Sequence, residues 1–129
     1  MNKVLIDTNI YSHAMRGTEE VVNSLKYIAD IGISAISIGE LLSGFKAGNK
    51  EKINRHELNI FLDSPRVTIY QVDEISAEFY SAILTQLKKQ GTPIPTNDIW
   101  IAASALQQGV PVYTFDKHFR HIAGLLLHS

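Results

Sequence analysis

Short apolar segments recur along this chain, and longer stretches with helical spacing separate them. They cover residues 3–6, 33–36, 67–72 and 112–115, and a fifth candidate lies at 125–127. Apolar residues follow one another within them, rather than alternating with polar residues as in strands that have one face in water. Strands of this kind, alternating with helices, predict an α/β fold in which a short parallel sheet is flanked by helices on both faces.

The stretches between these segments carry start and stop signals that are typical of helices. Ser37 and Glu40 match a capping box, which predicts that a helix begins at Ser37. Thr96 is expected to cap a later helix, and Gly91 follows the end of another. The helices are expected over residues 10–15, 18–29, 37–45, 50–62, 75–90, 96–109 and 116–120.

Length and composition predict one domain over residues 1–129. Apolar residues make up 45% of the chain and charged residues 19%, which excludes a disordered polypeptide. The absence of cysteine excludes disulfides and thiolate metal sites, and favours a cytoplasmic location. We expect no signal peptide and no membrane, because no apolar run approaches the roughly 20 residues of a membrane span.

Four carboxylates stand where predicted strands give way to helices. Asp7, Glu40 and Asp116 come just after strands, and Asp98 begins a helix that is apolar from Ile99 to Leu106 except for one serine. The strand ends and the following helix starts share one edge of a parallel sheet, so we expect all four acids at that edge. Each also has a purely structural interpretation, as a helix cap or as a charge that complements the helix dipole.

Four carboxylates gathered in one place repel one another unless a cation neutralises them. Oxygen ligands favour a hard ion, Mg²⁺ with Mn²⁺ able to substitute, over zinc. Acids around such ions suit hydrolysis of a phosphodiester, because the metal lowers the pKa of an attacking water. The histidines lack zinc-ligand spacing and are expected mainly at the surface or in packing: His13, His56, His118, His121 and His128.

Four segments contain these acids: VLIDTNIYSHAMRG, SAISIGELLSGF, IPTNDIWIAASAL and YTFDKHFRHIAGL. In this order and spacing, from Val4 to Leu125, they resemble the PIN-domain nucleases, and specifically the VapC-type toxins of bacterial toxin–antitoxin pairs. The resemblance implies a three-layer PIN-like fold. It also implies an endoribonuclease that depends on Mg²⁺ or Mn²⁺.

The resemblance further implies that the four acids hold the metal and carry the catalysis. It places Thr114 near the water shell of the metal, and Asn9 behind Asp7 as the residue that orients this carboxylate. It implies a cognate VapB-type antitoxin whose C-terminal segment wraps the toxin and blocks its active groove. It also favours a homodimer.

Basic residues beside these motifs are the candidates for contacts with RNA phosphates. Of the 13 Asp and Glu residues, nine remain when the four site acids are set aside, against 12 Lys and Arg residues. Arg16, Lys117 and Arg120 lie beside site motifs and are expected to bind phosphates. Two further clusters are either RNA contacts or solvated helix surface: Lys46 to Arg55, and Lys88 with Lys89. Three aromatic residues either stack on unpaired bases or, as we expect, lie in the core: Tyr11, Tyr113 and Phe119.

Two other functions fit parts of this pattern. A Mg²⁺-dependent phosphatase of the haloacid-dehalogenase type would use Asp7 as its nucleophile, but it requires a second aspartate where this chain has Asn9. A PIN-like module that binds RNA or a protein without catalysis is disfavoured, because all four acids are retained. The choice of RNA and the number of metal ions stay open.

Overall fold

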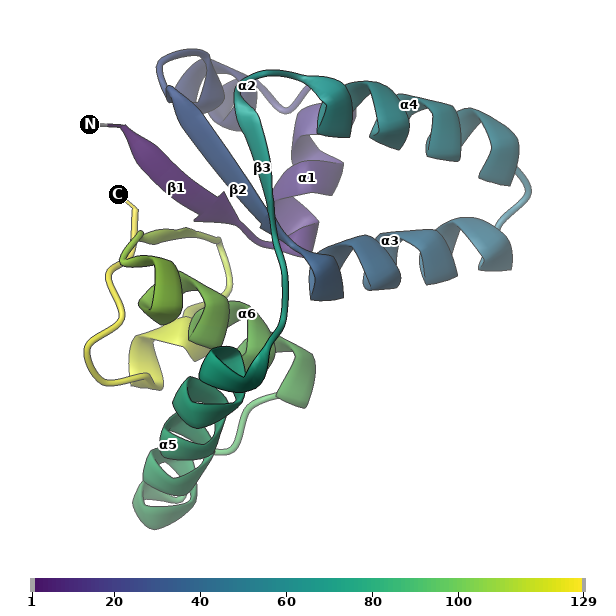
Figure 1. The fold of residues 1–129 in the computed structure, drawn as a ribbon. Coiled ribbons are helices and arrows are strands. Elements are labelled where there is room, and N and C mark those ends of the chain that lie inside the picture. Colours follow the sequence, from purple (N-terminus) through teal and green to yellow (C-terminus); the bar gives the residue numbers. More distant parts are fainter. Residues whose placement is uncertain (1, 129) are drawn as a thin grey trace.

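The computed structural model describes residues 2–128 and contains a four-stranded parallel sheet (Figure 1). Its strands are β1 (Lys3–Ile6), β2 (Asp30–Ser34), β3 (Val67–Tyr70) and β4 (Val112–Tyr113). They lie in the order β3-β2-β1-β4, and each neighbouring pair is parallel. The chain therefore moves outward from β1 to β3, and then crosses back to the other side of β1 to form β4.

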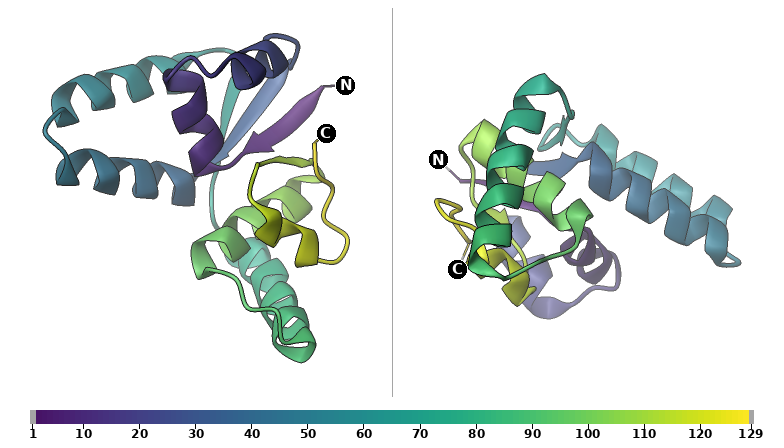
Figure 2. Two further views of the ribbon diagram at one scale, coloured as in Figure 1. Left: turned by 180° about the vertical axis from the view of Figure 1, so that it is seen from behind. Right: turned by 90° about the horizontal axis from the view of Figure 1, so that it is seen from below.

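Helices connect the strands throughout residues 2–128. They are α1 (Thr8–Met15), α2 (Glu19–Lys26), α3 (Ala35–Ala47), α4 (Glu51–Asp63), α5 (Glu74–Gln90), α6 (Thr96–Gln108) and the 3₁₀-helix η1 (Lys117–His121). The α3–α4 hairpin projects from the sheet on one side, while α5 and α6 pack against each other on the other side (Figures 1 and 2). Between residues 2 and 128, no helix has the length and apolar character needed to cross a bilayer.

The sheet separates two apolar cores, because successive side chains of β1 point to opposite faces. Leu5 packs into the core formed with α5 and α6, together with β4 and η1. Val4 and Ile6 pack into the second core, with residues of α1 to α4. The predicted three-layer α/β fold, with helices on both faces of a short parallel sheet, is confirmed.

The start of α3 differs from the prediction. β2 ends at Ser34, whose Oγ accepts the backbone N–H of Ile36 at 3.1 Å and so caps α3. Ser37 lies inside the helix, buried, and its Oγ has no hydrogen-bond partner among the described residues. The predicted capping box between Ser37 and Glu40 is therefore wrong, because the chain leaves the sheet three residues earlier. Glu40 lies in the second turn of α3.

Two smaller expectations also change. Pro95 occupies the cap position of α6 and makes no side-chain cap, so Thr96 is the first helical residue rather than the cap. The strand predicted over residues 125–127 is reduced to one parallel bridge between Leu127 and Val112. Both changes leave the sheet edge beyond β1 and β4 unaltered.

Candidate active site

The four predicted acids meet beyond the ends of β1 and β4, where the order of the strands reverses. Asp7 follows β1 directly, Asp116 follows β4, Glu40 comes from α3 and Asp98 from the first turn of α6. In open α/β sheets, ligands bind in the crevice at such a reversal point. The charges of Asp7, Glu40 and Asp116 all act on Asp98, so the structure brings the four together.

Asp7 is the most buried of these acids, with only 4% of its surface exposed. One carboxylate oxygen accepts the backbone N–H of Ile10 at 2.8 Å, which caps α1. The other accepts the hydroxyl of Thr114 at 2.5 Å. Burial raises the pKa of Asp7, these two hydrogen bonds oppose the rise, and the charges of Asp116 and Glu40 add to it. The carboxylate of Asp7 therefore both caps α1 and belongs to the group of four acids.

Glu40 is held by two polar side chains. The hydroxyl of Thr8 donates to Oε1 at 2.6 Å, and the side-chain amide of Asn97 donates to Oε2 at 3.2 Å. Sequence reasoning missed both donors. The available signal was their position, because Thr8 directly follows Asp7 and Asn97 directly precedes Asp98.

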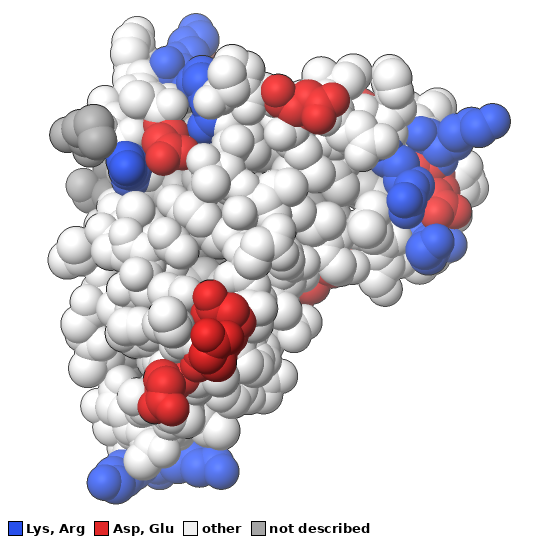
Figure 3. Space-filling view, in the orientation of Figure 1, with Lys and Arg blue, Asp and Glu red and all other residues white. Residues whose placement is uncertain are grey.

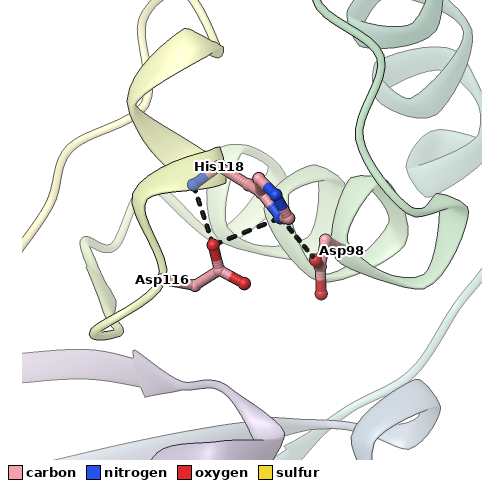
Figure 4. A group of neighbouring side chains, drawn as sticks. All are labelled: Asp98, Asp116 and His118. Carbon is pink, nitrogen blue, oxygen red and sulfur yellow. Dashed lines mark hydrogen bonds and ion pairs between the residues drawn. The ribbon is translucent and has the colours of Figure 1, made fainter.

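Asp98 and Asp116 share a histidine neighbour (Figure 4). Nδ1 of His118 lies 3.2 Å from Oδ1 of Asp116 and 3.8 Å from Oδ2 of Asp98. Burial raises the pKa of Asp98 to about 6, the charges of Asp116, Glu40 and Asp7 contribute in that order, and His118 opposes the rise. His118 is exposed, in line with the surface position expected of the histidines, but its ring also lies against two of the four acids, which sequence reasoning did not anticipate. The feature of the sequence that could have identified His118 is its position two residues after Asp116.

The donor set of this site fits a divalent cation. Within residues 2–128, neither a lysine nor an arginine forms an ion pair with any of the four carboxylates. Mutual repulsion among carboxylates is relieved by a bound cation, and oxygen-rich sites suit hard ions. One oxygen each from Asp98 and Asp116 and one nitrogen of His118 lie within 4.8 Å of one another, as the ligands of a single ion do.

The structure assigns the orientation of Asp7 to a different residue from the one expected. Asn9 lies exposed in the first turn of α1, and the hydrogen bonds to Asp7 come from Ile10 and Thr114. The hydroxyl oxygen of Thr114 also accepts the backbone N–H of Asp116 at 2.9 Å. The orienting role expected of Asn9 therefore falls to Thr114.

The predicted phosphate contacts lie at two places. Lys117 and Arg120 are exposed on η1, beside Asp116. Arg16 is exposed at the opposite end of α1 from Asp7, with Nη2 3.2 Å from Nδ1 of His13. Lys117 and Arg120 thus share a short helix that begins directly after Asp116, whereas Arg16 lies at the far end of α1 from Asp7.

The other candidate contacts lie further away. Basic residues gather at the tip of the α3–α4 hairpin (Figure 3), where Lys46 and Arg55 pair with Glu51. Lys88 and Lys89 lie in the last turn of α5. Both clusters are exposed on helix surfaces, and none of their residues pairs with one of the four acids.

The aromatic residues divide into buried and exposed ones. The expectation of a core position is confirmed for all three candidates: Tyr11, Tyr113 and Phe119. Phe115, which sequence reasoning did not consider, is 45% exposed. It lies between Thr114 and Asp116 in the chain, and its ring forms T-shaped pairs with the rings of His13 and Tyr113.

Comparison with known proteins identifies similar sequences and structures. The sequence pattern of the PIN domain matches residues 4–125. Ribonuclease VapC1 from Haemophilus influenzae (strain R2866) is 32% identical over 127 residues, covering 94% of this chain and 92% of the relative. Ribonuclease VapC1 from Methanocaldococcus jannaschii is 30% identical over 122 residues, covering 94% and 82%.

Solved structures agree with this similarity. A chain of VapBC2 from Rickettsia felis, bound to a DNA fragment from its promoter, superposes with a TM-score of 0.89 at 29% identity, covering 98% of this chain and 97% of that one. VapBC-1 from nontypeable Haemophilus influenzae gives a TM-score of 0.87 at 25% identity, covering 98% and 97%. The four acids all lie within the matched residues.

Proposed function

The chain belongs to the PIN-domain family, and from this premise we propose that it is an endoribonuclease and the toxin of a VapBC-type toxin–antitoxin pair. One observation carries the proposal: four carboxylates from distant segments converge at the strand-order reversal, where the charges of the other three act on Asp98. A binding module has no need of such a costly arrangement of like charges. A metal-dependent nuclease does.

We propose that Asp7, Glu40, Asp98 and Asp116 hold Mg²⁺, for which Mn²⁺ substitutes. A cation held there would lower the pKa of an attacking water and offset the negative charge that builds on the phosphate. Hard oxygen ligands and the lack of any thiolate support this choice of ion.

The polar side chains around the acids hold them in fixed orientations. The hydroxyl of Thr114 is hydrogen-bonded both to the carboxylate of Asp7 and to the backbone N–H of Asp116, so it keeps these two groups at a constant distance from each other. Thr8 and Asn97 each hold one oxygen of Glu40. Preorganised groups of this kind need no rearrangement as the reaction proceeds, which is the usual source of electrostatic catalysis.

We propose that RNA approaches over η1, because its exposed basic residues border the acids. Lys117 and Arg120 contact phosphates, and Arg16 contacts the strand further along. Phe115 offers an exposed ring for an unpaired base, held in place by the edges of its neighbours. Asn9, exposed near the start of α1, is available on the same approach.

We propose a VapB-type antitoxin as the protein partner, a homodimer as the assembly and a reducing cytoplasm as the compartment. Two adjoining hollows of about 400 and 210 Å³ lie along α1 and α4, and both include Met15 and Glu57. Phe61 lines the larger and Phe45 the smaller, so both hollows offer aromatic surface to an antitoxin segment.

Expression in a bacterial host tests the toxin proposal. The chain alone should arrest growth and produce new RNA 5′ ends, while co-expression of the small protein encoded beside it should relieve both effects. An Asp7→Asn variant, matched for expression level, should leave growth unaffected. Growth arrest by Asp7→Asn equal to that of the parent would contradict the proposal, because the arrest would then not require the nuclease site.

A further inference from the structure

His118 differs from the other histidines in facing two carboxylates from separate elements. Its backbone N–H donates to Oδ1 of Asp116 at 2.9 Å and starts η1 there. This short turn carries the ring back over the same carboxylate, with Nδ1 3.2 Å from Asp116 and 3.8 Å from Asp98 of α6 (Figure 4). The ring is neither a core residue nor a free surface group, since it is half exposed above the acids.

The separations match those of ligands around one ion. In an octahedral shell with bonds of about 2.1 Å, adjacent ligand atoms lie about 3 Å apart and opposite ones about 4.2 Å apart. The two distances from Nδ1 fall within this range.

A capping role for His118 accounts for less of this geometry. The backbone N–H of His118 already satisfies Oδ1 of Asp116, so the cap does not require the ring. The approach of the ring to Asp98 has no part in the cap, because Asp98 belongs to a different helix. The ring therefore pairs with both carboxylates at once, and its nitrogen lies where a cation shared by the two acids would take a third ligand.

We propose that His118 supplies a nitrogen ligand to the metal of this site, beside oxygen ligands from Asp98 and Asp116. The inference rests on the proposed metal-dependent function. Mg²⁺ takes oxygen ligands almost exclusively, whereas first-row transition ions also accept imidazole. A site with this nitrogen donor therefore favours Mn²⁺ over Mg²⁺ more strongly than four carboxylates alone would.

Calorimetric titration of Mn²⁺ and of Mg²⁺ into the purified chain at neutral pH tests this preference. His118→Ala should weaken Mn²⁺ binding by at least about tenfold and change Mg²⁺ binding much less, because no carboxylate is lost. His121→Ala is the matched control, since His121 is exposed in the same 3₁₀-helix, and both affinities should stay at the parent level. An unchanged ratio of the two affinities in His118→Ala would overturn the proposal.

Electron spin-echo spectroscopy of bound Mn²⁺ gives a direct readout that does not depend on activity. The parent chain should show a hyperfine coupling to a histidine nitrogen, and both His118→Ala and His118→Asp should lose it. His118→Asp should nevertheless keep Mn²⁺ bound and bind Mg²⁺ more tightly, because an oxygen replaces the nitrogen. Retention of the nitrogen coupling in His118→Ala would overturn the assignment.

The two proposals fail in different ways. Bound Mn²⁺ without a nitrogen coupling in the parent chain would remove His118 from the ligand set and leave the nuclease proposal intact. A nitrogen coupling lost in His118→Ala, together with no RNA cleavage by the parent chain, would keep the metal ligand and remove the nuclease.

Discussion

Thr114 donates a hydrogen bond from its hydroxyl to Oδ2 of Asp7, 2.5 Å away and 107 positions apart in the chain. The same hydroxyl oxygen accepts the backbone N–H of Asp116. One side chain at the end of β4 thus fixes the positions of two acids, at the point where β4 lies beside β1. The arrangement makes the hydroxyl of Thr114 a direct test of how the site is organised.

Thr114→Val should lower RNA cleavage and destabilise the fold. The variant keeps the shape of the side chain but removes the donor to a buried carboxylate, a loss of about 1.5–3 kcal/mol for a charged partner. It should also raise the pKa of Asp7 further, because Thr114 lowers it. Thr114→Ser should retain most activity.

Thr68→Val is the control for this prediction, measured by thermal melting and by cleavage rate. Thr68 also donates to an aspartate, Asp30, but at an exposed position on β3. Loss of this exposed hydrogen bond should change the free energy of unfolding by less than about 1 kcal/mol and leave the rate of RNA cleavage unaltered. Equal effects at the two threonines would show that Thr114 has no special role.

The raised pKa of Asp98 predicts how stability depends on pH in metal-free buffer. The pKa is about 6 in the folded chain and 3.8 in the unfolded one, so the folded chain binds more protons between these values. Stability should therefore fall as pH rises from 3.8 to about 6 and then level off, with the raised pKa of Asp7 acting in the same direction.

Melting of the parent and of Asp98→Asn in EDTA, across this pH range, measures the effect. Asp98→Asn should show a shallower fall and should melt above the parent at neutral pH, because one repelling charge is gone. Metal affinity should change in the opposite direction, rising with pH as the carboxylates ionise. Parallel curves for the two proteins would mean that neither burial nor the other acids raise the pKa of Asp98 in the folded chain.

Two serines near the start of α3 should respond oppositely to alanine. Ser34→Ala removes the side-chain cap of the helix and should lower stability by about 0.5–2 kcal/mol. Ser37→Ala removes a buried hydroxyl that has no partner among the described residues, and should be neutral or stabilising. Thermal melting distinguishes them, and a greater loss at Ser37 would contradict the position of the cap.

Salt dependence of RNA binding tests the proposed approach over η1. In a cleavage-inactive Asp7→Asn background, Lys117→Ala or Arg120→Ala should weaken binding and reduce the salt slope by about one unit per lost phosphate contact. Lys46→Ala at the hairpin tip, where Lys46 pairs with Glu51, should leave the slope unchanged. The reverse result would place the RNA on the hairpin.

The sheet and the convergence of the four acids at its edge could be predicted from the sequence because local patterns determine them. Uninterrupted apolar runs mark buried parallel strands, and an acid directly after such a run must lie at the ligand-binding edge, as Asp7 does. The start of α3 could not be fixed in this way. Ser34 and Ser37 are equally good caps by propensity, and the sheet register decides between them.

Hydrogen bonds between side chains far apart in the sequence could not be predicted either. Thr8 and Asn97 meet Glu40 across 32 and 57 positions, and only the packing of α1 and α6 against α3 brings them together. The position of His118 depends on η1, whose tight turn returns the ring toward Asp116. The sequence predicts a short helix over these residues, but not that it is a 3₁₀-helix, whose tighter turn sets the direction of the ring.

Cleavage of an end-labelled RNA pool is the most direct test of the central claim that the converging acids form a metal-dependent nuclease site. The parent chain should cut RNA in Mg²⁺ and fall to background in excess EDTA. Asp98→Asn should remain at background even in Mg²⁺, while Asp63→Asn, which alters an exposed acid at the end of α4, should cut like the parent. Full cleavage by Asp98→Asn, or by the parent chain in EDTA, would contradict the claim.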